Sequence, residues 1–148
     1  FGDIREGIMY LSESGRIIDK IWNEIPNRYE NASLDEYIIM PDHFHGIIWI
    51  DSPGGTDAIN FSASTDVINH VRTGGITGNK NPMLNPASIS NMIRWFKGRS
   101  SYEIRKLAGM ADFAWHARFY EHIIHNEESL ERIRKYIINN PASRYGRD

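Results

Sequence analysis

The sequence contains no cysteine, and this absence excludes two classes of structural chemistry. Without thiols there are no disulfides and no thiolate metal sites, so any metal ion would need His, Asp, Glu, Asn or Gln ligands. Long apolar runs are also absent: no stretch approaches the roughly 18 residues that a membrane helix requires, and no signal-peptide pattern opens the chain. We therefore expect a cytoplasmic protein without membrane contact.

The residues that are present describe one ordinary globular domain spanning 1–148. The chain has 148 residues, of which 41% are hydrophobic and 24% charged, as is usual for a single core. Its net charge of -2 argues mildly against nucleic-acid binding, but the distribution of charge matters more than the sum. A basic group surrounds one acid, Glu103, and is either a solvated helix face or a surface for a phosphate backbone; it comprises Arg94, Lys97, Arg99, Arg105 and Lys106.

Hydrophobic spacing in the first third of the chain predicts alternating strands and helices. A short strand is expected at 7–12, and apolar residues at helical spacing predict a helix over 12–26 that Pro26 stops. Two β-rich runs, 33–40 and 43–50, meet at a Pro-Asp turn, which predicts an antiparallel hairpin.

The rest of the chain is divided by a long stretch without periodicity. Residues 51–86 are rich in Gly, Asn, Ser and Thr, and so much structureless chain inside a domain is unusual; we expect a flexible insertion. Asn126 is a natural N-cap for the last helix, and Pro141 is expected to end it. The predicted elements here are a helix over 88–109, a strand over 113–124 and a helix over 126–141. The order predicts an α+β sandwich with an antiparallel hairpin at its centre.

Two histidines stand close together in the stretch PDHFHGIIWI, residues 41–50. On a strand, His43 and His45 project from the same face while Phe44 turns to the other, so both imidazoles can reach one divalent cation. An H-x-H pair alone more often has a structural role than a metal-binding one. A cupin-type site would need a following Glu, where the chain offers only Asp51, and the helical zinc-protease motif H-E-x-x-H is absent.

The last predicted helix offers a second polar pair, in YIINNP. Tyr136 and Asn140 are four residues apart and therefore share a helix face. Asn140 has an amide oxygen suited to Mg²⁺ or Mn²⁺, and the Tyr136 hydroxyl is a possible nucleophile. Taken alone, each residue is explained equally well by a structural role: Tyr136 as a half-buried aromatic residue and Asn140 as a C-cap before Pro141. Together with the histidines they favour a metal-assisted nucleophilic site.

Two blocks of the sequence carry a resemblance to a known family. The first is MPDHFHGIIWI (40–50), and the second is WHARFYEHIIHNE (115–127) followed by YIINNP (136–141). The chain resembles the single-tyrosine HUH transposases, and among them the REP-associated tyrosine transposases, over residues 1–141 apart from 51–86. It departs from the family pattern at His116, where Gln is usual, and at His125, where Arg is usual.

The resemblance implies a fold and a set of site residues. The fold is the HUH endonuclease fold, a ferredoxin-like sandwich with a central antiparallel sheet, and one further strand would precede Phe1. His43 and His45 match the metal ligands for Mg²⁺ or Mn²⁺, and Asn140 lies where related enzymes place a third polar ligand. Tyr136 matches the nucleophile. Tyr120 is a rival nucleophile of lower rank, because family members often have Trp or His there.

The function implied is metal-dependent transesterification of DNA, acting on single-stranded or hairpin DNA at repeat ends through a 5′-phosphotyrosine intermediate. A nucleoid-associated, cytoplasmic protein is expected, with the basic residues of 88–109 on the DNA backbone and Trp95 as a candidate for base stacking. The sequence leaves monomer and homodimer open. Two alternatives also stay open: a DNA-hairpin-binding protein of the same fold without cleavage activity, and a metal-dependent hydrolase of small phosphoesters.

Overall fold

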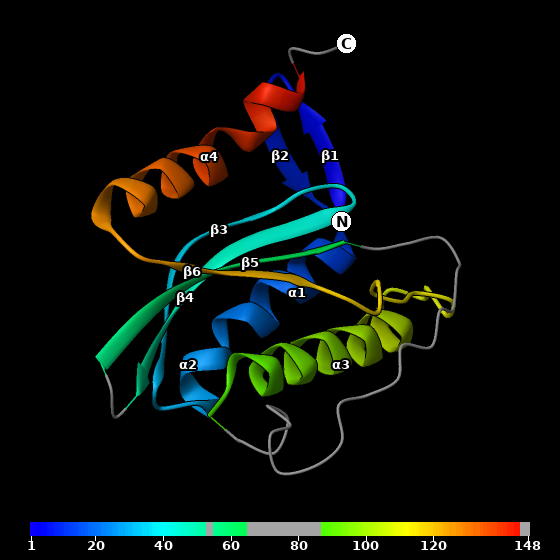
Figure 1. The fold of residues 1–148 in the computed structure, drawn as a ribbon. Coiled ribbons are helices and arrows are strands. Elements are labelled where there is room, and N and C mark those ends of the chain that lie inside the picture. Colours follow the sequence, from blue (N-terminus) through cyan, green and yellow to red (C-terminus); the bar gives the residue numbers. More distant parts are fainter. Residues whose placement is uncertain (53–54, 65–86, 146–148) are drawn as a thin grey trace.

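A four-stranded antiparallel sheet forms the centre of the computed structural model, which describes residues 1–52, 55–64 and 87–145. The strands lie in the order β3-β4-β5-β6 (Figure 1). Their bounds are β3 (Ala32–Ile39), β4 (His43–Ser52), β5 (Gly55–Ser64) and β6 (Tyr120–Ile124). The hairpin expected from 33–40 and 43–50 is β3-β4, and the expected α+β class with an antiparallel sheet is confirmed.

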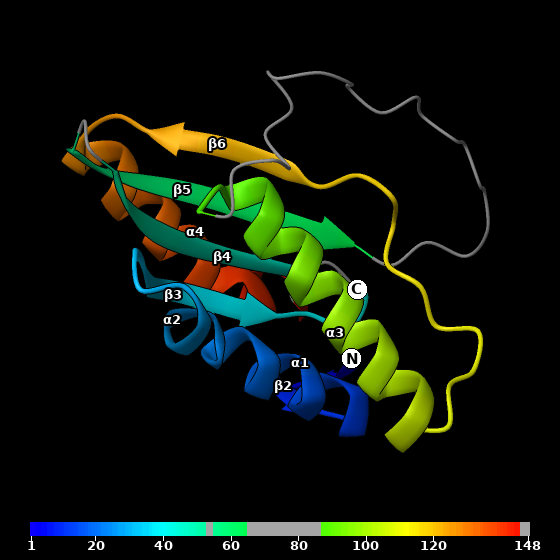
Figure 2. The same ribbon diagram turned by 90° about the horizontal axis from the view of Figure 1, so that it is seen from below.

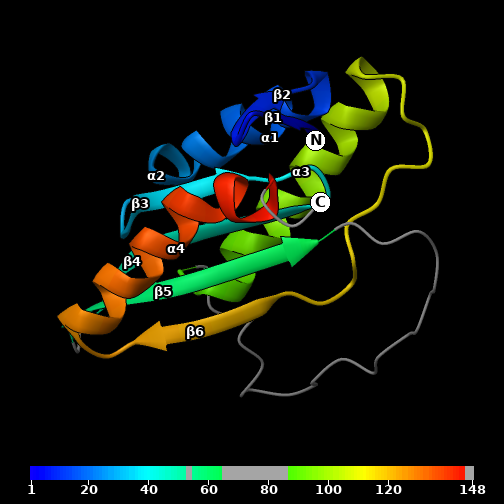
Figure 3. The same ribbon diagram turned by 90° about the horizontal axis from the view of Figure 1, so that it is seen from above.

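Helices cover both faces of this sheet. α1 (Glu13–Asn23), the short α2 (Ile25–Arg28) and α3 (Ile89–Leu107) lie on one face, and α4 (Glu127–Tyr145) lies on the other (Figures 2 and 3). None of the helices in the described residues is long and apolar enough to span a membrane. The two faces of the sheet therefore carry separate helical layers. Successive residues of one strand pack against different layers.

The larger core lies between the sheet and the α1/α3 layer. It is built on aromatic rings, with Trp22 of α1 at 4.5 Å from Phe44 and 5.3 Å from Phe96, measured between ring centroids. Gly46 lies beneath Trp22: a Cβ atom there would come within 2.6 Å of the Trp22 ring. A side chain at this position would separate α1 from β4, so glycine permits their close approach.

A smaller core lies between the sheet and α4. It contains Ile47 of β4, Ala58 of β5, Ile124 of β6, and Leu130 and Ile137 of α4, all buried. Because strand residues alternate between faces, Ile47 shares its face with His45 and His43. This small core therefore brings α4 against the face of the sheet that carries both histidines.

A separate hairpin precedes α1. β1 (Gly2–Arg5) and β2 (Ile8–Leu11) are joined by Glu6 and Gly7, which have φ values of 51° and 76°. Positive φ at both central residues is typical of the two-residue turn that matches strand twist. β2 confirms the strand expected at 7–12, whereas β1 was not predicted. The helix expected over 12–26 is α1, which ends at Asn23, three residues before Pro26; Pro26 itself lies in the first turn of α2.

The expectation of a structureless stretch from 51 to 86 is wrong for residues 55–64, which form the central strand β5. Its inward residues Ile59, Phe61 and Ala63 are buried at every second position. The polar residues between them complete the alternation of a strand; the expectation of a loop rested on the Gly, Asn, Ser and Thr content of 51–86 as a whole. Residues 65–86, the remainder of the expected insertion, lie outside the described residues.

Two further expectations need correction near the C-terminus. Within 113–124 only β6, at 120–124, is a strand; Phe113 and Trp115 are buried in irregular chain, and the Trp115 indole donates to Ser100 Oγ at 2.8 Å. Pro141 does not end the last helix, which continues to Tyr145. The N-cap is confirmed, because Asn126 Oδ1 accepts from the Ser129 amide at 2.8 Å.

Candidate active site

The two histidines of β4 lie side by side on the α4 face of the sheet. The ring centroids of His43 and His45 are 4.8 Å apart, with the rings nearly perpendicular. Nδ1 of His43 lies 2.7 Å from Oδ1 of Asp42. Because a carboxylate accepts a hydrogen bond, this contact places the proton on Nδ1 and leaves Nε2 of His43 available as a ligand.

His45 is held in its neutral form. Burial, together with the neighbouring His43, lowers the pKa of His45 to about 4. A neutral imidazole keeps a lone pair, and a lone pair is what a metal ion needs from histidine. The pair thus combines a histidine oriented by a carboxylate with one kept neutral by its surroundings.

Tyr136 reaches the histidines from α4. Its ring centroid lies 5.5 Å from that of His45, and 57% of the residue is exposed to solvent. The structure therefore brings His43, His45 and Tyr136, all expected from the sequence, into one site. The exposed tyrosine leaves its hydroxyl accessible to a large substrate.

Two residues that the sequence did not suggest position α4. The Arg134 guanidinium donates to both carboxylate oxygens of Asp35 on β3, from Nε at 2.9 Å and from a terminal nitrogen at 2.6 Å. The indole of Trp49 on β4 donates to the same carboxylate at 2.7 Å. These bonds lower the pKa of Asp35 to about 2. This ion pair fixes the helix two residues before Tyr136, and no local sequence pattern indicates that Arg134 pairs with Asp35.

Asn140 lies one helical turn after Tyr136 and is buried, with 8% of its surface exposed. Its side-chain nitrogen makes no hydrogen bond to any part of the chain that the structure describes. A buried amide normally finds a partner, and rotation of the amide would present its oxygen at the same position. Asn140 is therefore a buried amide of α4 whose nitrogen has no partner among the described residues, and its role as a third ligand stays a prediction.

No three His, Cys, Asp or Glu side chains come together as a metal site within residues 1–52, 55–64 and 87–145. A metal ion on His43 and His45 would therefore take its third protein ligand from another residue type. The two imidazoles are the donors that the structure brings together; the Asn140 amide lies on the helix of Tyr136, and both donor types suit a divalent cation.

Tyr120, the rival nucleophile, lies on the same face of the sheet but farther from the histidines. It pairs with Ser62 of β5, and Ser62 pairs with His45 of β4. Two strand spacings of about 4.8 Å place it roughly 10 Å from His45 along the sheet. The geometry therefore favours Tyr136 as the residue that acts beside the histidines.

The predicted DNA-binding residues lie on the opposite side of the sheet, on α3 (Figure 2). Arg94 and Lys106 are exposed, and Arg99 is paired with Glu103 at 2.9 Å. Lys97 and Arg105 hold the chain that follows α3: Lys97 donates to the carbonyls of His116 and Arg118, and Arg105 donates to that of Phe113. Burial lowers the pKa of Lys97 to about 8. The sequence did not indicate that the sheet separates these residues from the histidines.

Comparisons with known proteins add one relative. The chain is 30% identical over 142 residues to an "Uncharacterized protein" of Haemophilus influenzae, and the match covers 95% of this chain and 72% of that protein. No family model matches the chain. No solved structure matches it either.

Proposed function

The chain belongs to the family of this Haemophilus influenzae protein, and from the geometry of its candidate active site we propose that it is a metal-dependent DNA transesterase of the transposase type. It would cut and rejoin single-stranded DNA at hairpin-bearing repeat ends. In this proposal the sheet and α4 form an HUH endonuclease fold, and the chain is a REP-associated tyrosine transposase. The single observation that carries the proposal is the convergence of His43, His45 and Tyr136.

The position of Tyr136 beside the two histidines is informative because the apolar packing of α4 does not require it. Tyr136 is exposed and lies outside the small core under α4, where Leu130 and Ile137 make the apolar contacts. The helix is nevertheless anchored by Arg134 and Asp35 so that Tyr136 lies beside His45. A nucleophile next to two potential metal ligands is the arrangement that phosphoryl transfer requires.

His43, His45 and Asn140 would hold a divalent cation, Mg²⁺ or Mn²⁺. Bound there, the ion would neutralise charge on the scissile phosphate and favour ionisation of a nearby hydroxyl. Asp42 orients His43 through Nδ1, and burial keeps His45 uncharged. Both features preserve the ligand lone pairs.

Tyr136 would act as the nucleophile. Its Oη attacks phosphorus as the hydroxyl proton leaves, the bond from phosphorus to the 3′ oxygen breaks, and that oxygen departs as a 3′-hydroxyl. The strand end stays attached through a 5′-phosphotyrosine bond. Attack by a free 3′-hydroxyl reverses the sequence of bonds and releases Tyr136. Because one ester replaces another at each stage, no ATP is consumed.

A covalent-adduct assay tests the proposal. The protein is incubated with end-labelled single-stranded hairpin DNA and Mn²⁺, denatured, and analysed for protein-linked label. We expect an adduct that is absent from both Tyr136→Phe and His43→Ala. An adduct that survives Tyr136→Phe would contradict the assignment of the nucleophile. Hairpin binding without any adduct would instead support a DNA-binding protein of this fold that does not cleave.

A further inference from the structure

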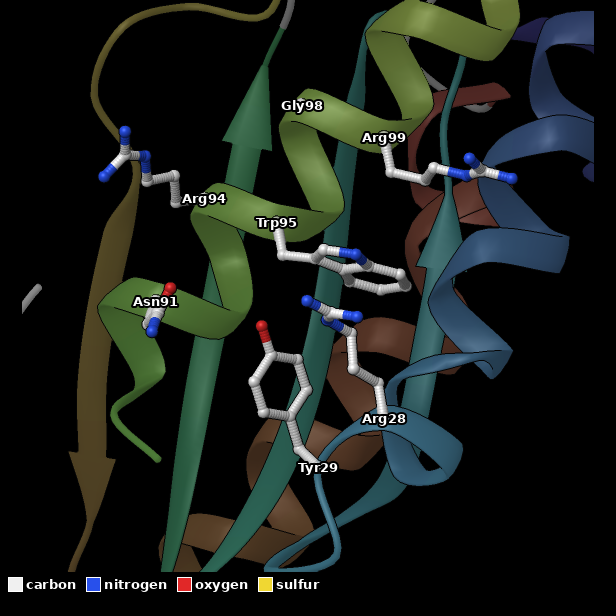
Figure 4. Close-up of a pocket in the computed structure, with 7 residues that line it drawn as sticks. All are labelled: Arg28, Tyr29, Asn91, Arg94, Trp95, Gly98 and Arg99. Atoms are coloured by element: carbon white, nitrogen blue, oxygen red, sulfur yellow. The ribbon is translucent and has the colours of Figure 1, made fainter. Parts of the chain in front are cut away.

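A cleft lies on the face of the sheet opposite the histidines and Tyr136. It has a volume of about 390 Å³ and lies between α3 and the end of α2 (Figure 4). The described residues that line it include three arginines, two aromatic residues and no acid; they are Arg28, Tyr29, Asn91, Arg94, Trp95, Gly98 and Arg99. The candidate active site uses none of them.

Three planar groups meet at the centre of the cleft (Figure 4). The Tyr29 and Trp95 rings lie edge to face, with centroids 6.1 Å apart. The central carbon of the Arg28 guanidinium lies 5.4 Å from the Trp95 centroid and 5.7 Å from the Tyr29 centroid. Arg28 is an exposed residue, and no carboxylate of the described chain pairs with it. The exposed guanidinium therefore adds a flat, positively charged group beside the two aromatic rings.

Positive charge flanks this cluster on both sides. Arg94 and Arg99 extend from α3 to opposite sides of Trp95 (Figure 4). Arg94 is exposed, and Arg99 forms a partly exposed pair with Glu103, a type of pair that contributes little. A nucleotide within a strand has a planar base and a phosphate on each side of it, so the planar groups and the positive charges of the cleft complement that unit.

We propose that one unpaired base of a nucleic-acid strand binds against the cluster of Arg28, Tyr29 and Trp95, and that Arg94 and Arg99 bind the phosphates on either side of it. The site takes a nucleotide with two flanking phosphates. Inorganic phosphate would engage the arginines alone, and a free mononucleotide would engage only one flank. The assignment rests on the proposed function insofar as both require a nucleic-acid substrate. It adds a contact point that the sheet separates from Tyr136.

Binding of a fluorescein-labelled, unstructured oligothymidylate to the full chain, followed by anisotropy, tests the assignment. Arg28→Ala and Trp95→Ala should each weaken binding by roughly tenfold, as expected for one stacked base. Trp95→Phe should retain most of the affinity, because it keeps a stacking ring. Arg94→Ala should reduce the slope of log affinity against log salt by about 0.7, as for one phosphate contact on a single strand.

The control is Arg5→Ala, which removes one exposed arginine on the β1-β2 hairpin, away from the cleft. Binding by Arg28→Ala and Arg94→Ala equal to that of Arg5→Ala would overturn the assignment. Competition by thymidine monophosphate as strong as that by the oligothymidylate would overturn the assignment to a strand. Circular dichroism of each variant establishes that it is folded, and Arg28→Ala tests the site even if Trp95→Ala does not fold.

Tyr136→Phe separates this inference from the proposed function. It should bind the oligothymidylate as the wild type does and form no adduct. An adduct in the wild type with normal binding by the cleft variants would overturn only the cleft. Loss of binding in the cleft variants, without any adduct in the wild type, would overturn only the proposed function.

Discussion

Arg134 of α4 and Asp35 of β3 form a two-bond ion pair across 99 positions of sequence, with donor–acceptor distances of 2.9 and 2.6 Å. The pair fixes α4 to the edge strand of the sheet two residues before Tyr136. The position of Tyr136 beside His45 therefore depends on an interaction that takes no part in the chemistry.

Removing this pair should destabilise the protein. Arg134→Ala leaves Asp35, whose side chain is 10% exposed, with only the Trp49 indole as a side-chain donor. We expect the free energy of unfolding to fall by about 1.5–3 kcal/mol, the usual value for hydrogen bonds to a charged group. Urea denaturation measures it. Glu131→Ala, which removes the more exposed partner of Arg134, should change stability by less than about 1 kcal/mol; equal losses would contradict this account.

Acid should lower the free energy of unfolding by protonating the same residue, Asp35. The pKa of Asp35 is lowered from 3.8 to about 2, so between these values the unfolded chain binds the proton more strongly than the folded chain does. The contribution is nearly complete above about pH 5 and is lost as the pH falls toward 2; it amounts to about 1–2 kcal/mol. Unfolding curves of wild type and Asp35→Asn across this range should converge. A constant difference would show that Asp35 is not responsible.

Gly46 should tolerate no side chain. A Cβ there would lie 2.6 Å from the Trp22 ring, in a core with no space for it, so Gly46→Ala should cost about 1–3 kcal/mol. Gly98→Ala is the matched control: nothing lies within 4 Å of the added atom. Because Gly98 is inside α3, alanine should stabilise the helix by about 0.5–1 kcal/mol. In thermal unfolding, we expect Gly46→Ala to lower the midpoint temperature and Gly98→Ala to raise it.

Asp42 should support metal binding without being a ligand. Asp42→Asn weakens the orientation of His43, and such outer contacts typically contribute 10- to 100-fold to metal affinity. Titration with Mn²⁺ followed by electron paramagnetic resonance measures the change. Asp51→Asn, at the far end of β4, where Asp51 bonds Thr56, should bind Mn²⁺ as the wild type does. Equal affinities of the two variants would contradict a role for Asp42.

The sequence was sufficient for the features that depend on local pattern. Alternation placed His43 and His45 on one face, the N-cap at Asn126 was identified, and helical spacing placed Tyr136 and Asn140 on one side of the last helix. The strand β5 was missed because its buried side chains include small residues such as Ala63, and its polar partners resemble a loop.

Contacts between residues far apart in the sequence could not be predicted from it, for a different reason. Pairing of Arg134 with Asp35 depends on which strand lies beneath α4, and periodicity does not encode strand order. The same holds for the placement of α3 and α4 on opposite faces, which separates Arg94 from the histidines. Pro141 was expected to end the helix from its own backbone chemistry, whereas α4 continues through it to Tyr145.

The central claim is that Tyr136 forms the bond to DNA, and peptide mapping of the adduct tests it most directly. Trypsin cleaves after Lys135 and Arg144, so Tyr136 falls in the peptide 136–144, whereas Tyr120 falls in 119–132. Mass spectrometry after nuclease digestion should find the nucleotide mass on the peptide that contains Tyr136. A nucleotide on 119–132 would contradict the account and make Tyr120 the nucleophile.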